Sequence, residues 1–457
     1  MQASRRTFFK SAMSLGIAGS AYASLAGCSP KASDEPVKTG LVADPEGLLD
    51  LPPGFTYSVH SRAGDIMSDG LKVPASHDGM ACFPVEGDAD RCILIRNHEL
   101  DPDEGSEGPF AGVAPTEAAL KAAYDVLPDG TPMPGGTTTM IFNLKTREVE
   151  RSFLSLSGTL RNCAGGITPW GSWISCEEST DEKHGYAFEV SASATGPVPT
   201  PPLAAMGRFK REAVAIDPRT GIVYQTEDEH DSLIYRFIPD APGELAKGGR
   251  LQVLAIMDKP AADTRNWDKP DLFPAGGSWD VHWIDVDDVT AERTPLRQQG
   301  YLKGAAVFAR GEGMCAAIEK TGTAIYFACT IGGQERLGQI WKYLPASNEG
   351  AEAEGEKSGK LVLHYESQNV NDMDMCDNIV AAPWGDLIIC EDGDGDQFVR
   401  GVSPDGHVYP IARNAHPDKS EFAGACFSPD GDTLFVNMQG PNATLAIRGP
   451  WAKIIRA

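Results

Sequence analysis

Short apolar runs alternate with proline and glycine turns along most of this chain of 457 residues. Six stretches repeat one pattern, which is a small or acidic start, an apolar run, a turn, a second apolar run and often an acidic end. Alternating or continuous apolar residues around such turns predict tight β-hairpins. The six stretches are HDGMACFPVEGDADRCILIRNHE from His77, NCAGGITPWGSWISCEE from Asn162, REAVAIDPRTGIVYQTED from Arg211, GEGMCAAIEKTGTAIYFACT from Gly311, CDNIVAAPWGDLIICED from Cys376 and EFAGACFSPDGDTLFVNMQ from Glu421.

Helical patterns are sparse, and PTEAALKAAYDVL near residue 120 is the best of them. The hairpins start 45 to 100 residues apart. The short intervals suit one four-stranded propeller blade, and the long ones leave room for insertions such as SASATGPVPTPPLAAMG. We therefore predict an all-β fold, a six-bladed β-propeller with loop insertions, as a single domain over residues 49–457. A pair of β-sandwiches is the competing architecture.

The turn prolines align the hairpins with one another. Counting six residues back from each turn proline reaches Asp78, Cys163, Glu212, Asp377 and Ala423. In the hairpin without that proline, Glu319 takes its place and the count reaches Gly313, beside Glu312. The inner strands of a propeller surround its axis, so these positions would converge on one cavity. A buried ring of one thiol and several carboxylates is costly unless cations neutralise it, which predicts a metal centre.

The far ends of the hairpins carry more oxygen ligands. They supply Asn97-His98-Glu99, Glu177-Glu178, Glu227-Asp228 and Glu391-Asp392. Carboxylates, amide carbonyls and waters suit calcium, whereas a thiolate suits a softer transition metal. The mixture indicates two kinds of ion in one site. The alternative, that these acids cap strand ends and bind water, stays open.

The N-terminal residues predict export. Residues 4–10, SRRTFFK, form a twin-arginine signal, and the uncharged stretch after them is too short and too weakly apolar to span a bilayer. Leu25-Ala26-Gly27-Cys28 resembles a lipoprotein cleavage site, so we expect removal of residues 1–27 and a lipid on Cys28. Ordinary cleavage with release is the alternative. Residues 28–48 would form a tether, and the expected location is the periplasm or a membrane surface reached only through the lipid.

Charge and missing motifs narrow the function classes. The formal net charge of −24 argues against nucleic acid or an anionic membrane surface as a partner. The sequence has no HExxH, paired CxxC, GxSxG, Walker or Rossmann signature. The acidic loop DGDGD at 392–396 lacks both the flanking helices and the twelfth-position glutamate of an EF-hand.

The cysteine count is odd once Cys28 is set aside. Nine of the ten cysteines remain, so at least one is free, metal-bound or paired between chains. The pairs Cys163 with Cys176, Cys315 with Cys329, and Cys376 with Cys390 bracket hairpins and could form disulfides. Twin-arginine export moves folded proteins out of the reducing cytoplasm, which weakens that interpretation. For the cysteines among apolar strand residues, buried core positions are the favoured interpretation: Cys82, Cys92, Cys176, Cys329, Cys390 and Cys426.

The combination of several segments resembles the PhoX alkaline phosphatases. These segments are NCAGGITPWGSWISCEE, HGYAFEV from His184, GRFKREAVAIDPRTGIVYQTED from Gly207, IYRFIP from Ile234, FARGEGM from Phe308, CDNIVAAPWGDLIICEDG and GACFSPDGDTLFVNMQ. The resemblance extends from about residue 50 to the C-terminus. It implies a six-bladed propeller exported by the twin-arginine route, with two ferric and three calcium ions at the axis, that hydrolyses phosphomonoesters.

Matching residue by residue, the resemblance implies roles for particular side chains. Cys163 would be the thiolate that bridges the irons, Glu212 and Glu312 would be carboxylates of the iron site, and Arg310 would reach the substrate phosphate. The candidates for calcium and outer ligands are Asp78, Glu99, Glu178, Glu227, Asp228, Asp377, Asn378 and Glu391. This chain departs from the family where Arg211 replaces a common histidine, and where Gly311 replaces a common proline.

The resulting hypothesis is a monomeric phosphomonoesterase with Fe(III) and Ca²⁺ as cofactors and small phosphate monoesters as substrates. The cations would screen the phosphate charge and stabilise the attacking and leaving oxygens. Two other classes stay open, a calcium-dependent lactonase on a six-bladed propeller and a non-catalytic, calcium-stabilised binding propeller. Cys163, in register with Asp78, Glu212 and Asp377, argues against both.

Overall fold

The strands group into five hydrogen-bonded sheets in the part of the chain that the structure describes. The structure is a computed structural model and describes residues 40–454, apart from 270–271, 352–353 and 355–358. The expected signal peptide and most of the expected tether, with Cys28, lie outside the described residues.

Each sheet is antiparallel and follows its own spatial order of strands. One sheet runs through β3 (His77–Val85), β4 (Asp88–His98), β5 (Gly135–Asn143) and β6 (Glu148–Thr159), and the next through β7 (Asn162–Ile167), β8 (Ser172–Glu177) and β9 (Ala187–Ser191). The largest runs through β10 (Arg211–Ile216), β11 (Val223–Glu227), β12 (Tyr235–Pro239), β13 (Gly249–Ile256), β14 (Ser278–Asp285), β18 (Gly359–Glu366), β17 (Gln339–Pro345), β16 (Gly322–Cys329) and β15 (Gly311–Glu319). The last two run through β1 (Leu49–Asp50), β22 (Val408–Asn414), β21 (Phe398–Val402), β20 (Leu387–Glu391) and β19 (Cys376–Ala381), and through β2 (Thr56–Arg62), β25 (Ala443–Arg448), β24 (Thr433–Met438) and β23 (Phe422–Phe427).

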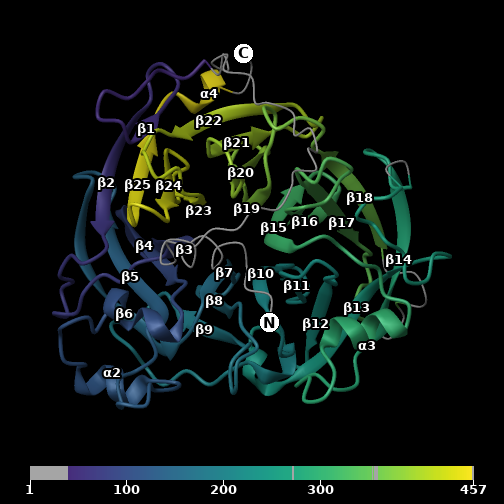
Figure 1. The fold of residues 1–457 in the computed structure, drawn as a ribbon, viewed down its shortest axis with the longest axis horizontal. Helices are drawn as coiled ribbons and strands as arrows, with labels where there is room; N and C mark the ends of the chain where they lie inside the picture. Colours follow the sequence, from purple (N-terminus) through teal and green to yellow (C-terminus); the bar gives the residue numbers. More distant parts are fainter. Residues whose placement is uncertain (1–39, 270–271, 352–353, 355–358, 455–457) are drawn as a thin grey trace, which may run out of the picture. The chain divides into compact units, whose positions relative to one another are not determined.

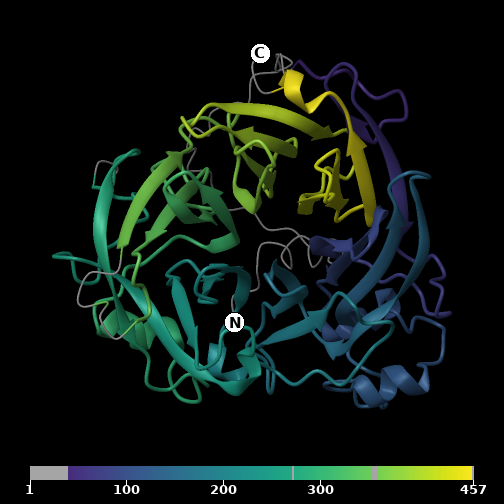
Figure 2. The same ribbon diagram turned by 180° about the vertical axis from the view of Figure 1, so that it is seen from behind.

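The sheets of residues 40–454 stand around a common centre (Figures 1 and 2). The innermost strands β3, β7, β10, β15, β19 and β23 contact one another in this order, and β23 in turn contacts β3. Each of the predicted hairpins supplies one of these strands and its neighbour. The all-β, propeller-like arrangement is therefore confirmed, and the paired β-sandwich is wrong.

Two connections tie the ring together. β2, near the start of the described chain, pairs with β25, near its end, with Thr56 opposite Arg448. β14 pairs with β13 on one side and with β18 on the other, so β10–β13 and β15–β18 share one continuous ladder. Long-range pairing thus closes the ring with backbone hydrogen bonds and leaves fewer free sheet edges.

Helices are short in the described residues. They are α2 (Glu117–Ala122), α3 (Leu296–Leu302) and α4 (Trp451–Ile454), with 3₁₀ turns at Pro102–Glu107, Ala204–Met206 and Leu245–Lys247. α2 falls in the segment with the best helical pattern, and the Thr116 hydroxyl caps it by accepting from the Ala119 N–H at 3.1 Å. No helix among the described residues is long and apolar enough to cross a membrane.

Apolar side chains of neighbouring sheets fill the space between them. Phe142 of β5, for example, is buried and meets the ring of Phe435 of β24 edge-on. All nine cysteines after Cys28 are free thiols. The bracketing pairs therefore do not form disulfides in this structure, and the six cysteines expected in the core are buried.

Candidate metal centre

A β-bulge recurs in every hairpin that lines the centre. In each, two residues of the inner strand oppose a single residue of the partner strand. A bulge removes its residues from the regular ladder and re-aims their side chains, and bulges concentrate near active sites. The bulged pairs are Asp78-Gly79, Cys163-Ala164, Glu212-Ala213, Glu312-Gly313, Asp377-Asn378 and Gly424-Ala425.

The first residue of the bulge is the acid or thiol in every pair except the last. The second residue is small in most of them because neighbouring inner strands approach closely there. A Cβ on Gly79 would lie 2.6 Å from the Ala164 Cα, and one on Gly313 would lie 2.5 Å from the Asp377 carbonyl oxygen. The bulges thus carry the acid and thiol side chains, and the small residues beside them allow the inner strands to approach one another closely.

The bulge residues and nearby acids form four overlapping groups. Within each group, one ligand atom per residue lies within 4.8 Å of the others. Cys163 belongs to the first two groups, Glu212 to the second and third, and Asp377 to the third and fourth. We call the nine members the acid ring: Asp78, Glu99, Cys163, Glu178, Glu212, Glu312, Asp377, Asp392 and Glu421.

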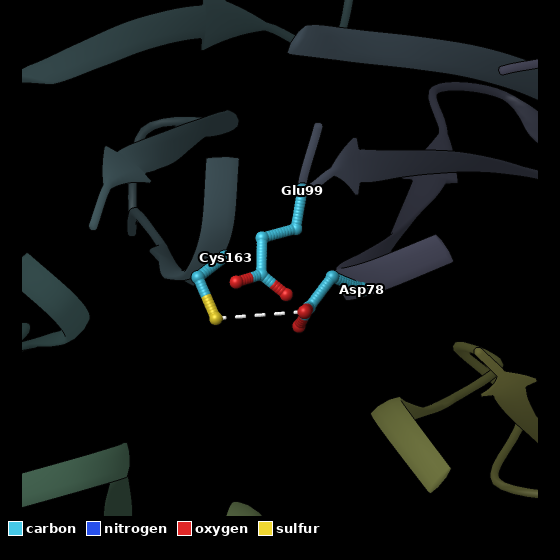
Figure 3. A group of neighbouring side chains, drawn as sticks. All are labelled: Asp78, Glu99 and Cys163. Carbon is cyan, nitrogen blue, oxygen red and sulfur yellow. Dashed lines mark hydrogen bonds between the residues drawn. The ribbon is translucent and has the colours of Figure 1, made fainter. Parts of the chain in front are cut away.

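Figure 3 shows the first group, in which Asp78, Glu99 and Cys163 approach one space from three separate segments. The Cys163 Sγ lies 3.4 Å from Asp78 Oδ2 and 2.9 Å from Glu212 Oε1. The thiol is fully buried between these carboxylates. Cys163 therefore stands at the junction of two candidate cation sites.

The acids at the strand ends fall into two sets, those at the last residue of a strand and those at the residue after it. Glu99, Glu178 and Asp392 each follow the last residue of β4, β8 and β20, and all three join the acid ring. The glutamates at the last position of a strand lie inside the sheets. Glu177 accepts from His184 Nδ1 at 2.7 Å, Glu227 from the Tyr235 hydroxyl at 2.7 Å, and Glu391 from Arg400 Nε at 2.9 Å.

Burial raises the pKa of two of these interior carboxyls. It raises the pKa of Glu227 to about 7, although Arg297 and Tyr235 act in the opposite direction. It also raises the pKa of Glu391 to about 7, with Arg400 opposing. Their hydrogen bonds to Tyr235 and Arg400 connect neighbouring strands of the two sheets.

Arg310 reaches the acid ring from the residue before β15, where its backbone φ is +53°. Its Nε and Nη2 donate to the two carboxylate oxygens of Asp228 at 2.7 and 2.9 Å, and Nη2 lies 2.6 Å from Glu312 Oε1. Burial lowers the pKa of Arg310, but Asp228 and Glu312 outweigh this effect and hold the pKa well above its usual value. Nη1 takes no part in these contacts.

The acid ring contains seven of the eleven ligand candidates that the sequence named. They are Asp78, Glu99, Cys163, Glu178, Glu212, Glu312 and Asp377. Glu227 and Glu391 lie inside the sheets, Asp228 holds Arg310, and Asn378 accepts from the Gly424 N–H at 2.6 Å. Their ligand roles stay predictions. Asp392 and Glu421 also belong to the ring. The sequence named Asp392 only among the strand-end acids and did not name Glu421 as a ligand.

The two departures from the family pattern lie outside the acid ring. Arg211 is fully buried, donates to the Gly207 carbonyl at 2.6 Å and stacks on Phe209 with 4.1 Å to the ring centroid. Gly311 begins β15 and pairs with Cys329. In this structure Arg211 therefore supports the loop before β10, and nothing places it among the ligand groups.

The donor set fits metal ions. Among the described contacts, Arg161 reaches Glu99 and Glu178, and Arg310 reaches Glu312. The eight carboxylates of the acid ring, all of them buried except Asp392, lie with the Cys163 thiol in groups close enough to share an ion, and bound cations would stabilise their charged forms. The oxygens suit calcium, and the Cys163 sulfur suits a softer transition metal.

Comparison with known proteins shows the family and the fold. The family model described as alkaline phosphatase PhoX matches residues 38–141 and 129–442. No curated protein matches the sequence significantly. Among solved structures, Pseudomonas fluorescens PhoX in complex with vanadate, a transition-state analogue, is similar with a TM-score of 0.64 and 18% identity, covering 90% of this chain and 97% of that chain.

A more distant likeness is to a gluconolactonase from Xanthomonas campestris, with a TM-score of 0.41 and 11% identity, covering 88% of this chain and 98% of that chain. The structural similarity to PhoX supports the fold, and the family match extends over most of the sequence. The chain therefore belongs to the PhoX alkaline phosphatases, a family of phosphoric monoester hydrolases.

Proposed function

We propose that this protein releases phosphate from small organic phosphate esters at the acid ring, with ferric iron and calcium as its cofactors. The observation that carries the proposal is Cys163, a buried thiol shared by two ligand groups that otherwise contain only carboxylates. A centre that needed calcium alone would have no use for a sulfur ligand at this junction.

The residues divide by donor chemistry and position. Cys163 with Glu212 and Glu312 would hold iron, and the remaining acid-ring carboxylates would hold calcium, now including Asp392 and Glu421 in place of Glu227 and Glu391. When bound, such ions supply charge stabilisation for the phosphoryl group and an activated oxygen nucleophile. The bulges fix these ligands from separate strands, so the centre is organised before substrate arrives.

Arg310 is proposed to bind the substrate phosphate. Asp228 holds one edge of its guanidinium by two hydrogen bonds, which orients the fork and leaves Nη1 to donate to a phosphate oxygen. Asp228 would then be a positioning residue for Arg310. A lysine could carry the charge, but it could not be held by two parallel hydrogen bonds.

The wider organisation belongs to the same proposal. We count six blades, with β10–β13 and β15–β18 as two blades that β14 joins; one hairpin per blade at the centre supports this count. The domain would span residues 49–457, after a twin-arginine signal at 1–27 and a tether at 28–48, with Cys28 lipidated. The protein would work as a periplasmic or membrane-tethered monomer without a nucleic-acid partner.

The first experiment is hydrolysis of p-nitrophenyl phosphate at alkaline pH by purified, folded protein, with calcium and then with a calcium chelator. We expect nitrophenol release that the chelator stops, together with iron and calcium in elemental analysis. Cys176→Ser is the matched control, because it changes a buried thiol of the same hairpin that lies outside the acid ring. Calcium without iron, and no phosphate release, would contradict the proposal and favour a lactonase or a binding propeller.

A further inference from the structure

Arg161 is a buried cation beside the acid ring that the sequence did not single out. It precedes β7 with a backbone φ of +44°, and its side chain is 14% exposed. Nη2 lies 2.8 Å from Glu99 Oε1 and 2.7 Å from Glu178 Oε2, Nη1 donates to Asp101 at 3.2 Å, and Nε donates to the Glu178 carbonyl at 3.1 Å. Its guanidinium thus bridges two acid-ring carboxylates.

Those two carboxylates belong to different ligand groups. Glu99 shares its group with Asp78 and Cys163, whereas Glu178 shares its group with Cys163 and Glu212. One side chain therefore links both groups that meet at the Cys163 thiol. A displacement of Arg161 would release a carboxylate in each of them.

Arg161 and Arg310 occupy equivalent places in their hairpins. Each stands two residues before the first bulge residue, each has a positive φ, and each contacts the acid that follows the second strand of the preceding hairpin. For Arg161 that acid is Glu99, and for Arg310 it is Asp228. The two arginines differ in how much of the guanidinium is used.

In Arg161, all three nitrogens already donate to protein oxygens. In Arg310, Nε and Nη2 hold Asp228 and Glu312, and Nη1 takes no part in those contacts. A guanidinium has five N–H donors in a fixed fork, so Arg161 is suited to hold several protein acceptors at set angles. The geometry therefore favours different roles for the two residues.

We propose that Arg161 is a positioning residue that orients Glu99 and Glu178 as ligands of two neighbouring metal ions. This inference rests on the proposed metal centre. Outer partners that fix the direction of metal ligands typically contribute tenfold to a hundredfold in metal affinity. The nearby acids also hold the pKa of Arg161 well above its usual value against the opposing effect of burial, so its charge is permanent.

The test is calcium binding to chelator-treated protein in the absence of substrate, measured by calorimetry for the wild type, Arg161→Gln and Arg161→Lys. Arg161→Gln is expected to bind calcium about 10-fold to 100-fold more weakly, and Arg161→Lys is expected to recover part of the loss because it keeps charge without the fork. Iron and calcium content of the untreated proteins, from elemental analysis, should fall in the same order.

Arg91→Gln is the matched control. Arg91 also bridges two acids, Asp88 and Glu150, but it lies on the exposed side of β4 and outside the acid ring. Its calcium affinity should stay within about twofold of the wild type, because exposed ion pairs contribute little. A fall of equal size in both arginine variants would make the effect one of general charge and overturn the proposal.

The outcomes separate this inference from the proposed function. A wild type that binds calcium while folded Arg161→Gln binds it equally well overturns the role of Arg161 alone. A wild type that binds no calcium refutes the metal centre itself. If circular dichroism shows that Arg161→Gln is unfolded, the calcium affinity of Arg161→Lys tests the proposal instead. An affinity equal to that of the wild type would contradict it.

Discussion

The acid ring and the sheet interiors behind it both contain buried carboxylates, yet they differ in what surrounds each carboxylate. In the interiors, each acid has dedicated donors; Glu177, for example, accepts from His184 Nδ1 and from the Gly185 N–H at 2.9 Å. In the acid ring, ligand atoms lie within 4.8 Å of one another in groups of three, and two of the four groups include the Cys163 thiol. Sequence neighbours such as Glu177 and Glu178 fall on opposite sides of this division.

The difference teaches that burial alone does not mark a metal ligand. A buried carboxylate with its own arginine, tyrosine or histidine is balanced by the protein. Carboxylates and a thiol whose ligand atoms group within reach of one ion form a donor set that suits metal ions. Substituting one residue on each side of the division should therefore separate loss of metal from loss of stability.

The largest contrast is expected between Cys163→Ser and Cys176→Ser. Cys163→Ser should lower kcat/KM by at least about 100-fold and reduce bound iron, because it removes the shared sulfur ligand. Cys176→Ser buries a hydroxyl in an apolar cluster and should cost about 1–3 kcal/mol of unfolding free energy with iron retained. Steady-state kinetics, elemental analysis and denaturant titration measure these effects. Full activity in Cys163→Ser would contradict the role of Cys163 as a metal ligand.

An intermediate contrast is expected between Asp392→Asn and Glu391→Gln. Glu391 is fully buried against Arg400, so its replacement should lower the unfolding free energy by about 3 kcal/mol, because it leaves a buried charge unpaired. Asp392→Asn should instead lower calcium content and activity while stability changes by less than about 1 kcal/mol. Chemical denaturation and elemental analysis of both variants check this. Loss of calcium in Glu391→Gln and loss of stability in Asp392→Asn would contradict the assignment of Asp392 as the ligand and Glu391 as the structural residue.

The smallest effect concerns pH and the interior pair of His184 with Glu177. Burial lowers the pKa of His184, but Glu177 and Asp125 outweigh it and hold the pKa above its ordinary value of 6.5. A raised pKa stabilises the fold fully below about pH 6.5, and this contribution is lost as pH rises through the folded-state value. His184→Gln should therefore cost on the order of 1 kcal/mol at pH 6 and less at pH 9. A difference that grew with pH would contradict this sign.

The sequence did not predict the bulges, but the count from the turn proline reached the first bulge residue in four hairpins, because turn and bulge are separated there by a fixed length of extended strand. The count from the turn identified Asp78, Cys163, Glu212 and Asp377, and all four are first bulge residues. In the last hairpin it reached Ala423, one residue before the bulge. In β15 the turn has no proline, and the count reached Gly313, one residue beyond Glu312. The register there was recovered only through the family resemblance.

The strand ends and the last hairpin were harder to predict. Glu391 still pairs with Cys376 in the ladder, whereas Asp392 has left it, and both read as acids at the end of one apolar run. The last hairpin has Gly424-Ala425 in its bulge, and its acid-ring carboxylate, Glu421, comes from before β23. Neither periodicity nor turn chemistry distinguishes these positions, because the choice depends on which way the chain leaves the sheet.

The pairing of β2 with β25 determines when the sheet that contains β2 can be completed during translation. β2 spans Thr56–Arg62 and its partner β25 spans Ala443–Arg448, so β2 has no neighbour in its sheet until residue 448 has been translated. A chain truncated before β25 would keep an open sheet edge, which invites aggregation and recognition by chaperones. The contact that completes this sheet therefore forms only after all the other described strands have been translated.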